Sequence, residues 1–283
     1  MRVLRTSPVR VLGEGDSAAV HALLDADPVG NVFVSSRLRA AGLNPGRLGG
    51  ELWGYVEHGS ITALCYAGAN LVPVNAGPDA VRHFAGHARW QGRRCSSIVG
   101  PVAAVTDLWQ RLGPYWGPAR VIRTRQPVLE AEQIPAAVVP DPLVRRVRMS
   151  ELGILLPACV AMFTEEVGVP PDSGDGGALY RARVEELVRM GRAFARIEDG
   201  RVVFKAEVGA ATPHVCQVQG VWVHPDLRGR GHSVAGMAAV VQAARAEIAP
   251  RVTLYVNDFN TPARAVYQKV GFREVGEVMS ILF

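Results

Sequence analysis

The segment Gln219–Ser233, QGVWVHPDLRGRGHS, places two glycines and two arginines between an apolar strand and a helix. The first backbone N–H groups of a helix have no intrahelical acceptor, and the helix dipole makes that end positive, so such a junction binds anions. Gly229 and Gly231 allow the backbone to approach a ligand closely. Arg228 and Arg230 supply guanidinium groups that suit phosphate. The segment therefore predicts a phosphate-binding loop, without specifying the ligand.

Two common phosphate-binding motifs do not fit this spacing. A dinucleotide fingerprint requires a third glycine at the position that Val234 occupies. A P-loop requires a lysine directly before Ser or Thr, and the chain's two lysines, Lys205 and Lys269, lie elsewhere. Both motifs are excluded on spacing alone.

The loop resembles the acetyl-CoA loop of the GNAT N-acetyltransferases, which reads [QR]-x-x-G-x-[GA]. Here Arg228 and Gly231 match, and Ser233 stands where the family has Gly or Ala. Further along, Asn260–Phe272 resembles the family's second motif, N-x-x-A-x-x-x-Y-x-K-x-G-F. The resemblance covers about residues 143–283, and the whole chain looks like a two-domain bacterial subtype with a poorly characterised N-terminal half.

The resemblance implies roles for individual residues. The backbone of Val221, Trp222 and Val223 would pair with pantetheine and polarise the thioester carbonyl. Asn260 would hydrogen-bond the pantetheine arm, and Tyr267 would bind there and protonate the departing thiolate. The pyrophosphate would be held by the loop residues Arg228, Gly229, Arg230, Gly231, His232 and Ser233. Acetyl-CoA, or another short acyl-CoA, would be the co-substrate, and no metal is expected.

The chemistry of transfer needs an acid and a base. A phenol with a pKa near 10 can protonate a thiolate whose conjugate acid lies near 8.5, which suits Tyr267. An alkyl amine with a pKa near 10.4 must lose a proton before it attacks, so a base is expected. Gln217 lies near the family's base position and cannot act as one. Glu207 on the preceding strand, and Glu165 or Glu166 at the end of a helix, remain candidates, with Glu166 and Glu207 preferred.

Hydrophobic periodicity predicts the elements that position these residues. The second half reads β-α-α-β-β-β-α-β-α-β-β, with a polar loop at 170–177. Ser150 is a plausible N-cap for the first helix. The expected elements are a strand at 143–149, helices at 150–167 and 178–192, a hairpin of 193–197 with 202–208, a strand at 215–223, a helix at 233–249, a strand at 251–256, a helix at 262–270, and a closing pair of 272–275 with 278–282.

The first half has weaker signals and no loop of the acetyl-CoA type. It predicts helices at 17–26, 79–90 and 101–112, a three-strand meander at 52–56, 61–66 and 70–74, and extended segments at 96–99, 121–124 and 128–129. The tail of this order echoes the second half, which raises the hypothesis of a degenerate GNAT-like repeat. We predict an α/β (α+β) chain with a mixed, mostly antiparallel GNAT-type sheet flanked by helices. Its parts are an N-terminal α/β domain at 1–130, a Pro-rich linker at 131–142 and a GNAT domain at 143–283.

Composition limits the function classes. The 283 residues are 48% hydrophobic and 20% charged, which excludes disorder as the dominant state. No apolar run reaches the roughly 20 residues of a membrane span, and no apolar segment follows the basic start as in a secretory signal, so a cytoplasmic protein is expected. The net charge of +5 is spread over scattered arginines, and the four cysteines lack metal-ligand spacing. Neither nucleic acid nor membrane is an expected partner.

The function predicted from the resemblance is that of an acetyl-CoA-dependent N-acetyltransferase. The acyl group would pass directly from CoA to a primary amine in a ternary complex. The acceptor would be a small-molecule amine or an amine of a peptide or protein, and the enzyme would be a monomer or homodimer. The alternative is a non-catalytic acyl-CoA-binding regulatory protein, which would bind the same ligand without turnover.

Overall fold

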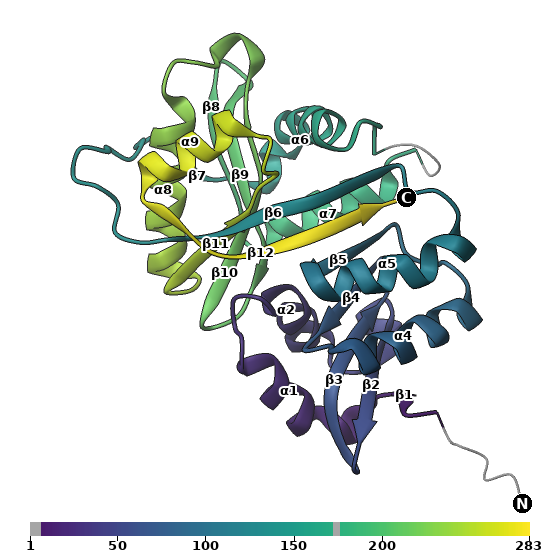
Figure 1. Cartoon of the computed structure of the whole chain (residues 1–283). Coiled ribbons are helices and arrows are strands. Elements are labelled where there is room, and N and C mark those ends of the chain that lie inside the picture. The colour runs from purple at the N-terminus through teal and green to yellow at the C-terminus, as the bar shows by residue number, and fades with distance from the viewer. Residues whose placement is uncertain (1–6, 172–175) are drawn as a thin grey trace, which may run out of the picture. The chain divides into compact units, whose positions relative to one another are not determined.

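A computed structural model describes residues 7–171 and 176–283 of the chain (Figure 1). The chain forms two compact units. Unit 1 contains the chain up to Val128 together with Val275–Phe283, and unit 2 contains Leu129–Glu274. Residues 172–175 of the loop expected at 170–177 lie outside the described residues.

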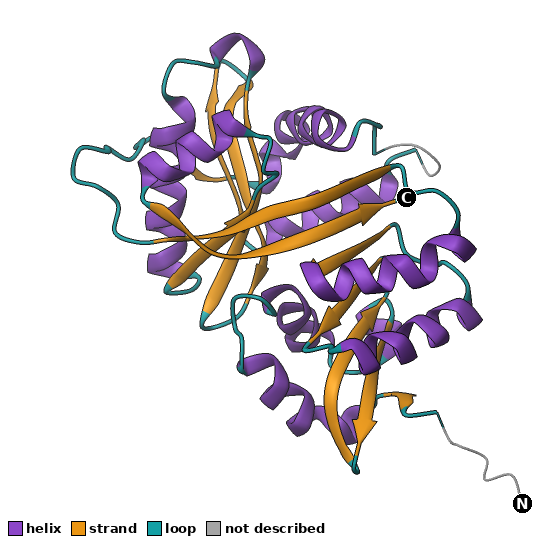
Figure 2. Ribbon diagram, in the orientation of Figure 1, coloured by secondary structure: helices purple, strands orange, loops and turns teal. Residues whose placement is uncertain are grey.

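Unit 1 is built from helices packed on a mainly antiparallel sheet (Figure 2). Its helices are η1 (Glu14–Asp16), α1 (Ser17–Asp25), α2 (Val32–Ala41), α3 (Pro45–Leu48), α4 (Pro78–Gln91) and α5 (Val102–Trp116). Its strands are β1 (Val9–Val11), β2 (Glu51–Glu57), β3 (Ser60–Ala67), β4 (Asn70–Val74) and β5 (Ser97–Pro101). Two longer strands, β6 (Val121–Ala131) and β12 (Phe272–Leu282), contribute residues to both units.

The sheet of unit 1 follows the order β1-β2-β3-β4-β5-β12. The expected meander is confirmed, because β2, β3 and β4 pair antiparallel in sequence, and β4 then pairs parallel with β5. The C-terminal part of β12 pairs antiparallel with β5, with Ile281 opposite Ile98. Both isoleucine side chains are fully buried, so the last residues of the chain complete this core.

Unit 2 carries the remaining elements. Its helices are η2 (Met149–Glu151), α6 (Leu152–Val167), α7 (Ala178–Arg189), η3 (Pro225–Leu227), α8 (His232–Glu247) and α9 (Thr261–Val270). Its strands are β7 (Arg145–Arg146), β8 (Ala193–Glu198), β9 (Arg201–Ala211), β10 (Val215–Val223) and β11 (Arg251–Tyr255), in the sheet order β11-β10-β9-β8-β7. One core packs α8 on the sheet through Phe204, Val208 and Met237, and a second packs α6 on it through Leu155 and Cys159.

The two units repeat one order of elements. Each runs β-α-α-β-β-β-α-β-α, with the short α3 as an addition in unit 1. The pairing repeats as well, because β3–β4 and β9–β10 are antiparallel whereas β4–β5 and β10–β11 are parallel. The predicted class, a mixed and mostly antiparallel sheet flanked by helices, is confirmed. The repeated order supports the hypothesis of a duplicated fold.

Several local expectations differ from the structure. Ser150, expected as the N-cap of the first helix, lies within η2, and the N-cap of α6 is Glu151. The strand expected at 143–149 is reduced to β7.

The closing pair predicted at 272–275 and 278–282 is one continuous strand, β12, which lies between β5 and β6 in the sheet. The two short segments at 121–124 and 128–129 are likewise one strand, β6. Helix α2 was not predicted, because its first turn, Val-Phe-Val, is typical of a strand.

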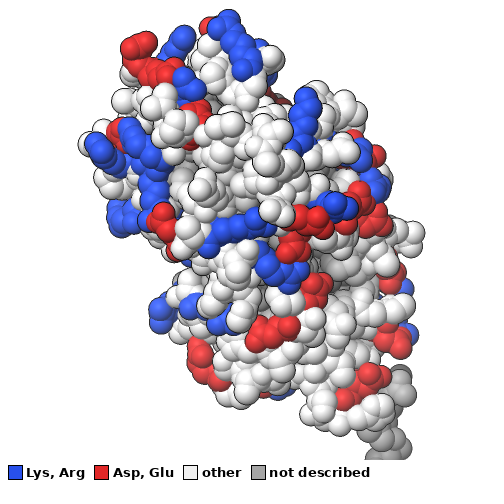
Figure 3. Space-filling view, turned by 90° about the vertical axis from the view of Figure 1, so that its left-hand side faces the viewer, with Lys and Arg blue, Asp and Glu red and all other residues white. Residues whose placement is uncertain are grey.

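On the surface, basic and acidic side chains lie close to one another. Arginines pair with carboxylates in both units, for example Arg10 with Asp16 and Arg189 with Glu185. On the face in Figure 3, basic and acidic groups lie interspersed. Among residues 7–171 and 176–283, no helix has both the length and the apolar character needed to cross a bilayer.

Candidate active site

A β-bulge interrupts strand β10 in front of the predicted loop. The antiparallel register with β9 shifts between Gln219 and Trp222, so Gly220 and Val221 face no single partner. Gly220 has φ +60°, and an added Cβ would lie 3.0 Å from the carboxyl carbon of Glu207. Only glycine fits this position without strain. The bulge takes the backbone of Val221 out of the regular ladder with β9.

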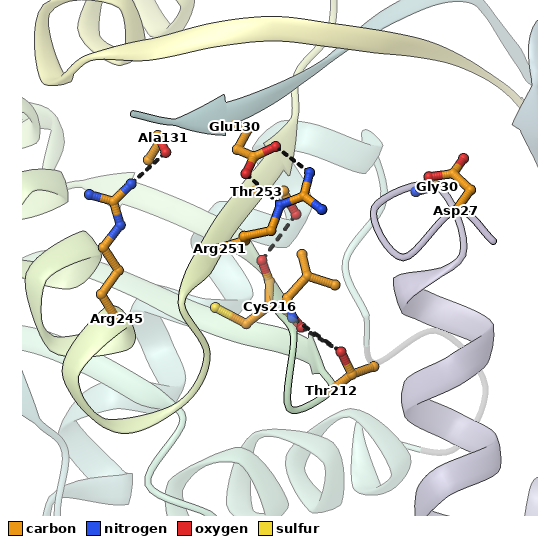
Figure 4. Close-up of polar contacts among 10 residues, drawn as sticks. Asp27, Gly30, Glu130, Ala131, Thr212, Cys216, Arg245, Arg251 and Thr253 are labelled. Carbon is orange, nitrogen blue, oxygen red and sulfur yellow. Dashed lines mark hydrogen bonds and ion pairs between the residues drawn. The ribbon is translucent and has the colours of Figure 1, made fainter. Parts of the chain in front are cut away.

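Strand β10 also loses its partner on the other side. Its parallel pairing with β11 joins Val215–Gln217 to Arg251–Thr253, and β10 then continues to Val223. The paired ends are fixed by side chains: the Thr253 hydroxyl donates to the Cys216 carbonyl at 3.0 Å (Figure 4). Beyond that point the N–H and C=O groups of β10 are available to an extended ligand that would continue the sheet.

A further pair holds β11 in place within unit 2. Two nitrogens of the Arg251 guanidinium donate to the two carboxylate oxygens of Glu130, each at 2.7 Å. This contact lowers the pKa of Glu130 below its ordinary value. The Arg245 guanidinium donates to the neighbouring carbonyl of Ala131 (Figure 4). These contacts hold the first residues of β11 in place. The later residues of β11 are the ones that diverge from β10.

The glycine loop then leads into helix α8. Gly229 has φ +77° and Gly231 has φ +85°, which are left-handed values that favour glycine. An added Cβ would meet nothing within 4 Å at either position, so the backbone conformation, not crowding, requires glycine there. Gly231 is the N-cap of α8, and His232 and Ser233 form its first turn. Their N–H groups therefore lie at the start of a helix, where backbone N–H groups lack intrahelical acceptors.

Arg228 is paired with a carboxylate. Its guanidinium donates to both oxygens of Glu165, at 2.7 and 3.0 Å, and its Nε donates to the Val223 carbonyl at 3.1 Å. The indole Nε1 of Trp222 donates to the same carboxylate at 3.1 Å. Glu165 therefore links the end of α6 to strand β10 and to the loop. Trp222 is buried and holds this linkage through its side chain.

Asn260 stands at the start of helix α9. Its side-chain oxygen accepts the backbone N–H of Ala263 at 3.2 Å, which caps the helix. Pro262 follows within the first turn, where proline is favoured because no intrahelical N–H is lost. The cap explains why an Asn suits this position, and the residue is exposed, so its amide nitrogen can still reach a ligand.

Tyr267 lies on α9 and is 7% exposed. Its ring packs against Phe272, and its hydroxyl has no hydrogen-bond partner among the described residues. Burial raises the pKa of Tyr267 well above its ordinary value, and the charge of Glu166 raises it further. The phenol therefore stays protonated at neutral pH, as a proton donor must.

The two predicted bases differ in their surroundings. Glu166 is exposed at the end of α6, where it influences both Tyr267 and Tyr180. Glu207 is 7% exposed: Gln219 donates to one of its oxygens at 3.1 Å, and Lys205 to the other at 3.3 Å. The structure brings Glu166 and Tyr267 within electrostatic range, whereas Glu207 is held by an amide and an ammonium group.

Sequence reasoning missed Lys205. Its side chain is 1% exposed and in hydrogen-bond contact with Cys159 as well as Glu207. Burial alone would lower the pKa of Lys205, but Glu207 and Cys159 raise it, so the ammonium form is kept. The available signal was that one of only two lysines in the chain stands in an otherwise apolar strand. Tyr180, whose hydroxyl donates to the Cys159 carbonyl at 2.9 Å, belongs to the same cluster and was also missed.

The part of unit 2 that contains the β-bulge and the glycine loop matches a known family. The model of the acetyltransferase (GNAT) family matches residues 172–272. The chain contains a GNAT-family domain. A second model, a domain of unknown function termed DUF4081, matches residues 50–155. No curated protein sequence matches the chain.

Solved structures of similar fold extend over both units. A GCN5-related N-acetyltransferase from Sphaerobacter thermophilus has a TM-score of 0.61 at 18% identity, over 96% of this chain and 93% of that one. A Drosophila protein has a TM-score of 0.64 at 13% identity, over 98% and 99%. A tandem GNAT protein from the clavulanic acid biosynthesis pathway has a TM-score of 0.52 at 14% identity, over 97% and 98%. At these identities the likeness shows the fold of the chain and not its substrate.

Proposed function

We propose that the chain is an acyl-CoA-dependent N-acyltransferase. The observation that carries this proposal is one continuous arrangement in the GNAT domain: the bulged strand β10, its divergence from β11, and the glycine loop at the start of α8. It supplies an open strand edge for a pantetheine arm and a cluster of N–H groups for a diphosphate. The residues of β10 and of the glycine loop fit acyl-CoA as the co-substrate, which supplies an activated acyl group as a thioester.

Three elements, the glycine loop, β10 and α9, would each bind a different part of acyl-CoA. The loop of Gly229–Ser233 would hold the diphosphate through backbone N–H groups, with Arg230 adding charge. Val221 and Val223 would pair with the pantetheine amides along β10, and Asn260 would bind the same arm from α9. A backbone N–H at the bulge that meets the developing oxyanion would lower the barrier by roughly 3 kcal/mol.

Tyr267 is the proposed acid. The neutral amine nitrogen attacks the thioester carbonyl carbon, the nitrogen of the resulting tetrahedral intermediate releases its extra proton to water, and the C–S bond then breaks. Tyr267 gives its phenolic proton to the departing thiolate sulfur, and solvent restores it. The raised pKa keeps the buried phenol protonated at neutral pH, but it also makes the phenol a weaker acid, so the transfer requires a thiolate that forms in the same desolvated surroundings.

Glu166 is the proposed base. Its exposure lets it take a proton from an incoming ammonium group, either directly or through a water molecule. We assign Glu207 a positioning role, because its two oxygens already accept hydrogen bonds from Gln219 and Lys205. Its contact with the bulge at Gly220 places it where it would fix the shape of β10.

A primary amine is the proposed acceptor, and two measurements test the function. Calorimetry with CoA and acetyl-CoA tests binding, and release of free thiol from acetyl-CoA in the presence of a panel of amines tests transfer. We expect micromolar binding and amine-dependent thiol release. Absence of binding would overturn the proposal. Binding without turnover on small amines, amino acids and peptides would instead favour an acyl-CoA-binding regulatory protein.

A further inference from the structure

Unit 1 contains a cavity that the proposed acyl transfer does not use. Its volume is about 390 Å³, at the small end of the range for small-molecule sites, roughly 300–1,000 Å³. Its floor is apolar, formed by the buried residues Trp53, Leu71, Ala88 and Cys95. The whole lining lies within residues 45–116, so the cavity belongs to unit 1 alone.

A carboxylate is fixed in the wall of this cavity. The indole Nε1 of Trp53 donates to Glu51 Oε2 at 2.7 Å, and the amide of Gln91 donates to the same oxygen at 2.9 Å. These two hydrogen bonds lower the pKa of Glu51, so the group is an anion at neutral pH. Both donors meet one oxygen, which leaves lone pairs on the other oxygen for a further donor.

Helix ends add negative potential at the same place. The lining includes Gln91 and Gly92 at the C-terminal end of α4, and Trp116, the last residue of α5. The C-terminal end of a helix carries partial negative charge and attracts cations. Together with Glu51, these ends favour a positively charged group inside the cavity.

A positive side chain and an unused donor border the same space. Arg94 lines the cavity, is exposed, and makes no hydrogen bond or close ion pair among the described residues, although its charge acts on Glu51. The indole N–H of Trp116 is buried without a hydrogen-bond partner in the described part of the chain. Leaving such a donor unsatisfied is unfavourable. The border therefore offers a guanidinium that is suited to a carboxylate.

We propose that this cavity binds a small zwitterion of the α-amino acid type, with its ammonium group on Glu51 and its carboxylate on Arg94. The apolar floor formed by Leu71, Ala88 and Cys95 would take a short uncharged side chain. This second site is independent of acyl-CoA, because its residues lie in another unit from the glycine loop and its test measures binding alone.

A phosphate-bearing ligand fits this cavity poorly. The two helices present their C-terminal ends to it, and Glu51 would repel a diphosphate. In unit 1 the helix start that follows β4, at Pro78, lies at the opposite end of α4 from the lining residues Ala88 and Gln91. The cavity is thus distinct from the position that the glycine loop takes in unit 2.

Indole N–H signals in ¹H–¹⁵N spectra give a direct test. The probes are glycine, L-alanine, L-serine and L-leucine, with n-butylamine and butyrate as single-charge analogues, each added to the full chain up to roughly 10 mM, where a millimolar dissociation constant is measurable. The signals are assigned with Trp→Phe variants. We expect the amino acids to shift the Trp53 and Trp116 indole signals and to leave that of Trp222, in the GNAT domain, unchanged.

Two variants separate the charges. Glu51→Gln should weaken binding of the amino acids at least about tenfold, and Arg94→Gln should do the same while leaving the weak binding of butylamine intact. Glu57→Gln, at the other end of β2, and Arg82→Gln, near the start of α4, are matched controls that should change nothing. Thermal unfolding shows whether each variant is folded, and Arg94, being exposed, can be replaced without loss of packing.

Three outcomes would overturn the proposal. The first is that none of the amino acids shifts the Trp53 signal of the wild-type chain. The second is that the shifts persist at equal affinity in both Glu51→Gln and Arg94→Gln. The third is that butyrate binds more tightly than every amino acid, because the cavity would then prefer an anion. Failure of acetyl-CoA binding in the GNAT domain would leave these results untouched.

Discussion

At the scale of single residues, two equally buried side chains of the GNAT domain, Tyr267 and Glu207, differ in their hydrogen-bond partners. Tyr267 is buried and protonated, and no acceptor for its hydroxyl lies within residues 7–171 and 176–283, which suits a proton donor. Glu207 is as buried as Tyr267, but both of its oxygens accept hydrogen bonds, which suits a positioning role. Similar burial therefore leads to different chemistry, because the partners differ.

Replacement of Tyr267 by Phe tests the proposed acid directly. The ring would still pack on Phe272, but no proton would reach the thiolate, so we expect kcat to fall at least about tenfold with little change in CoA affinity. Steady-state kinetics and calorimetry measure the two quantities. As a control, Tyr115→Phe changes a 60% exposed tyrosine of unit 1 and should leave kcat unchanged. Equal kcat in Tyr267→Phe and wild type would rule out the acid role.

Replacement of Glu165 by Gln tests the contact that occupies Arg228. A diphosphate and Glu165 would compete for the same guanidinium, so removal of the carboxylate should lower KM for acetyl-CoA. The pair is about half exposed, with side chains 49% and 46% accessible, and such pairs contribute about 0–1 kcal/mol, so the expected change is up to roughly fivefold.

The matched control for Glu165→Gln is Glu185→Gln. Glu185 also pairs with an arginine, Arg189, but on the exposed face of α7. Its replacement should leave KM unchanged. A rise in KM for Glu165→Gln would mean that Glu165 prepares Arg228 for binding, contrary to the competition argued here.

At the scale of elements, helix α8 must approach the sheet closely for the loop to sit at its start. An added Cβ at Gly236 would lie 2.7 Å from the ring of Phe204, which is fully buried. We therefore expect Gly236→Ala to lower the free energy of unfolding by about 1–3 kcal/mol through overpacking, as measured by denaturant unfolding.

Gly153→Ala is the control for that substitution. Gly153 lies in helix α6, where an added Cβ would meet nothing within 4 Å. Because Ala favours helix over Gly, the change should be neutral or should stabilise by up to about 1 kcal/mol. If both glycine variants behaved alike, the close approach of α8 to Phe204 would not be limiting.

The 3-10 turn η2, which precedes helix α6, is capped by an ionised carboxylate. Glu151 accepts hydrogen bonds from the guanidinium of Arg145, at 2.6 and 2.8 Å, and from the backbone N–H of Arg148 at 2.9 Å. These contacts lower the pKa of Glu151 to about 2 in the folded state. Because the folded value is depressed, the stabilisation is complete above the unfolded value and is lost as pH falls toward 2.

Glu151→Gln should therefore destabilise the chain by roughly 1 kcal/mol at pH 7, as for a lost helix cap. The difference in stability from wild type should shrink between about pH 5 and pH 2, where wild type itself becomes protonated. Thermal unfolding across this range measures it, with Glu185→Gln as an exposed control. A difference that stayed constant down to pH 2 would show that the charge of Glu151 is not the cause.

Sequence reasoning located the elements of the site well where several local signals agree. The helix predicted at 262–270 is α9, Thr261–Val270, because Asn260 and Pro262 mark its start and Gly271 its end. The β-bulge at Gly220 could not be predicted, since it depends on the register between β9 and β10 and on the side chain of Glu207. The pairing of Arg228 with Glu165 was also hidden, because these residues are 63 positions apart in the chain.

At the scale of the whole molecule, the chain repeats one order of elements, and the glycine-rich loop lies in the second copy. In unit 2 the connection from β10 to α8 contains the arginines and glycines of residues 228–231, whereas in unit 1 only residues 75–77 join β4 to α4. The order of the strands and helices expected from the sequence indicated this repeat. It could not show that residues 275–283 pair with unit 1, because a strand's partner is set by long-range contacts.

Because the last residues of β12 belong to unit 1 although they follow unit 2 in the chain, we can predict how cooperatively the two units unfold. Ile281 lies opposite Ile98 in the sheet of unit 1 and is fully buried, although it follows the residues that match the GNAT family. Ile281→Ala should cost about 2–5 kcal/mol and act first on unit 1. Hydrogen exchange followed by mass spectrometry should show faster exchange in β4, β5 and α5 than in α8.

Val275→Ala is the control, because Val275 is 52% exposed on the same strand and its truncation should change exchange little. If Ile281→Ala instead accelerated exchange in α8 as much as in β5, the two units would unfold together and the last strand would stabilise the chain as one cooperative body. If only β5 and its neighbours responded, the C-terminal residues would belong to unit 1 in energy as well as in position. The second outcome is expected, because the buried contacts of Ile281 lie in the core of unit 1.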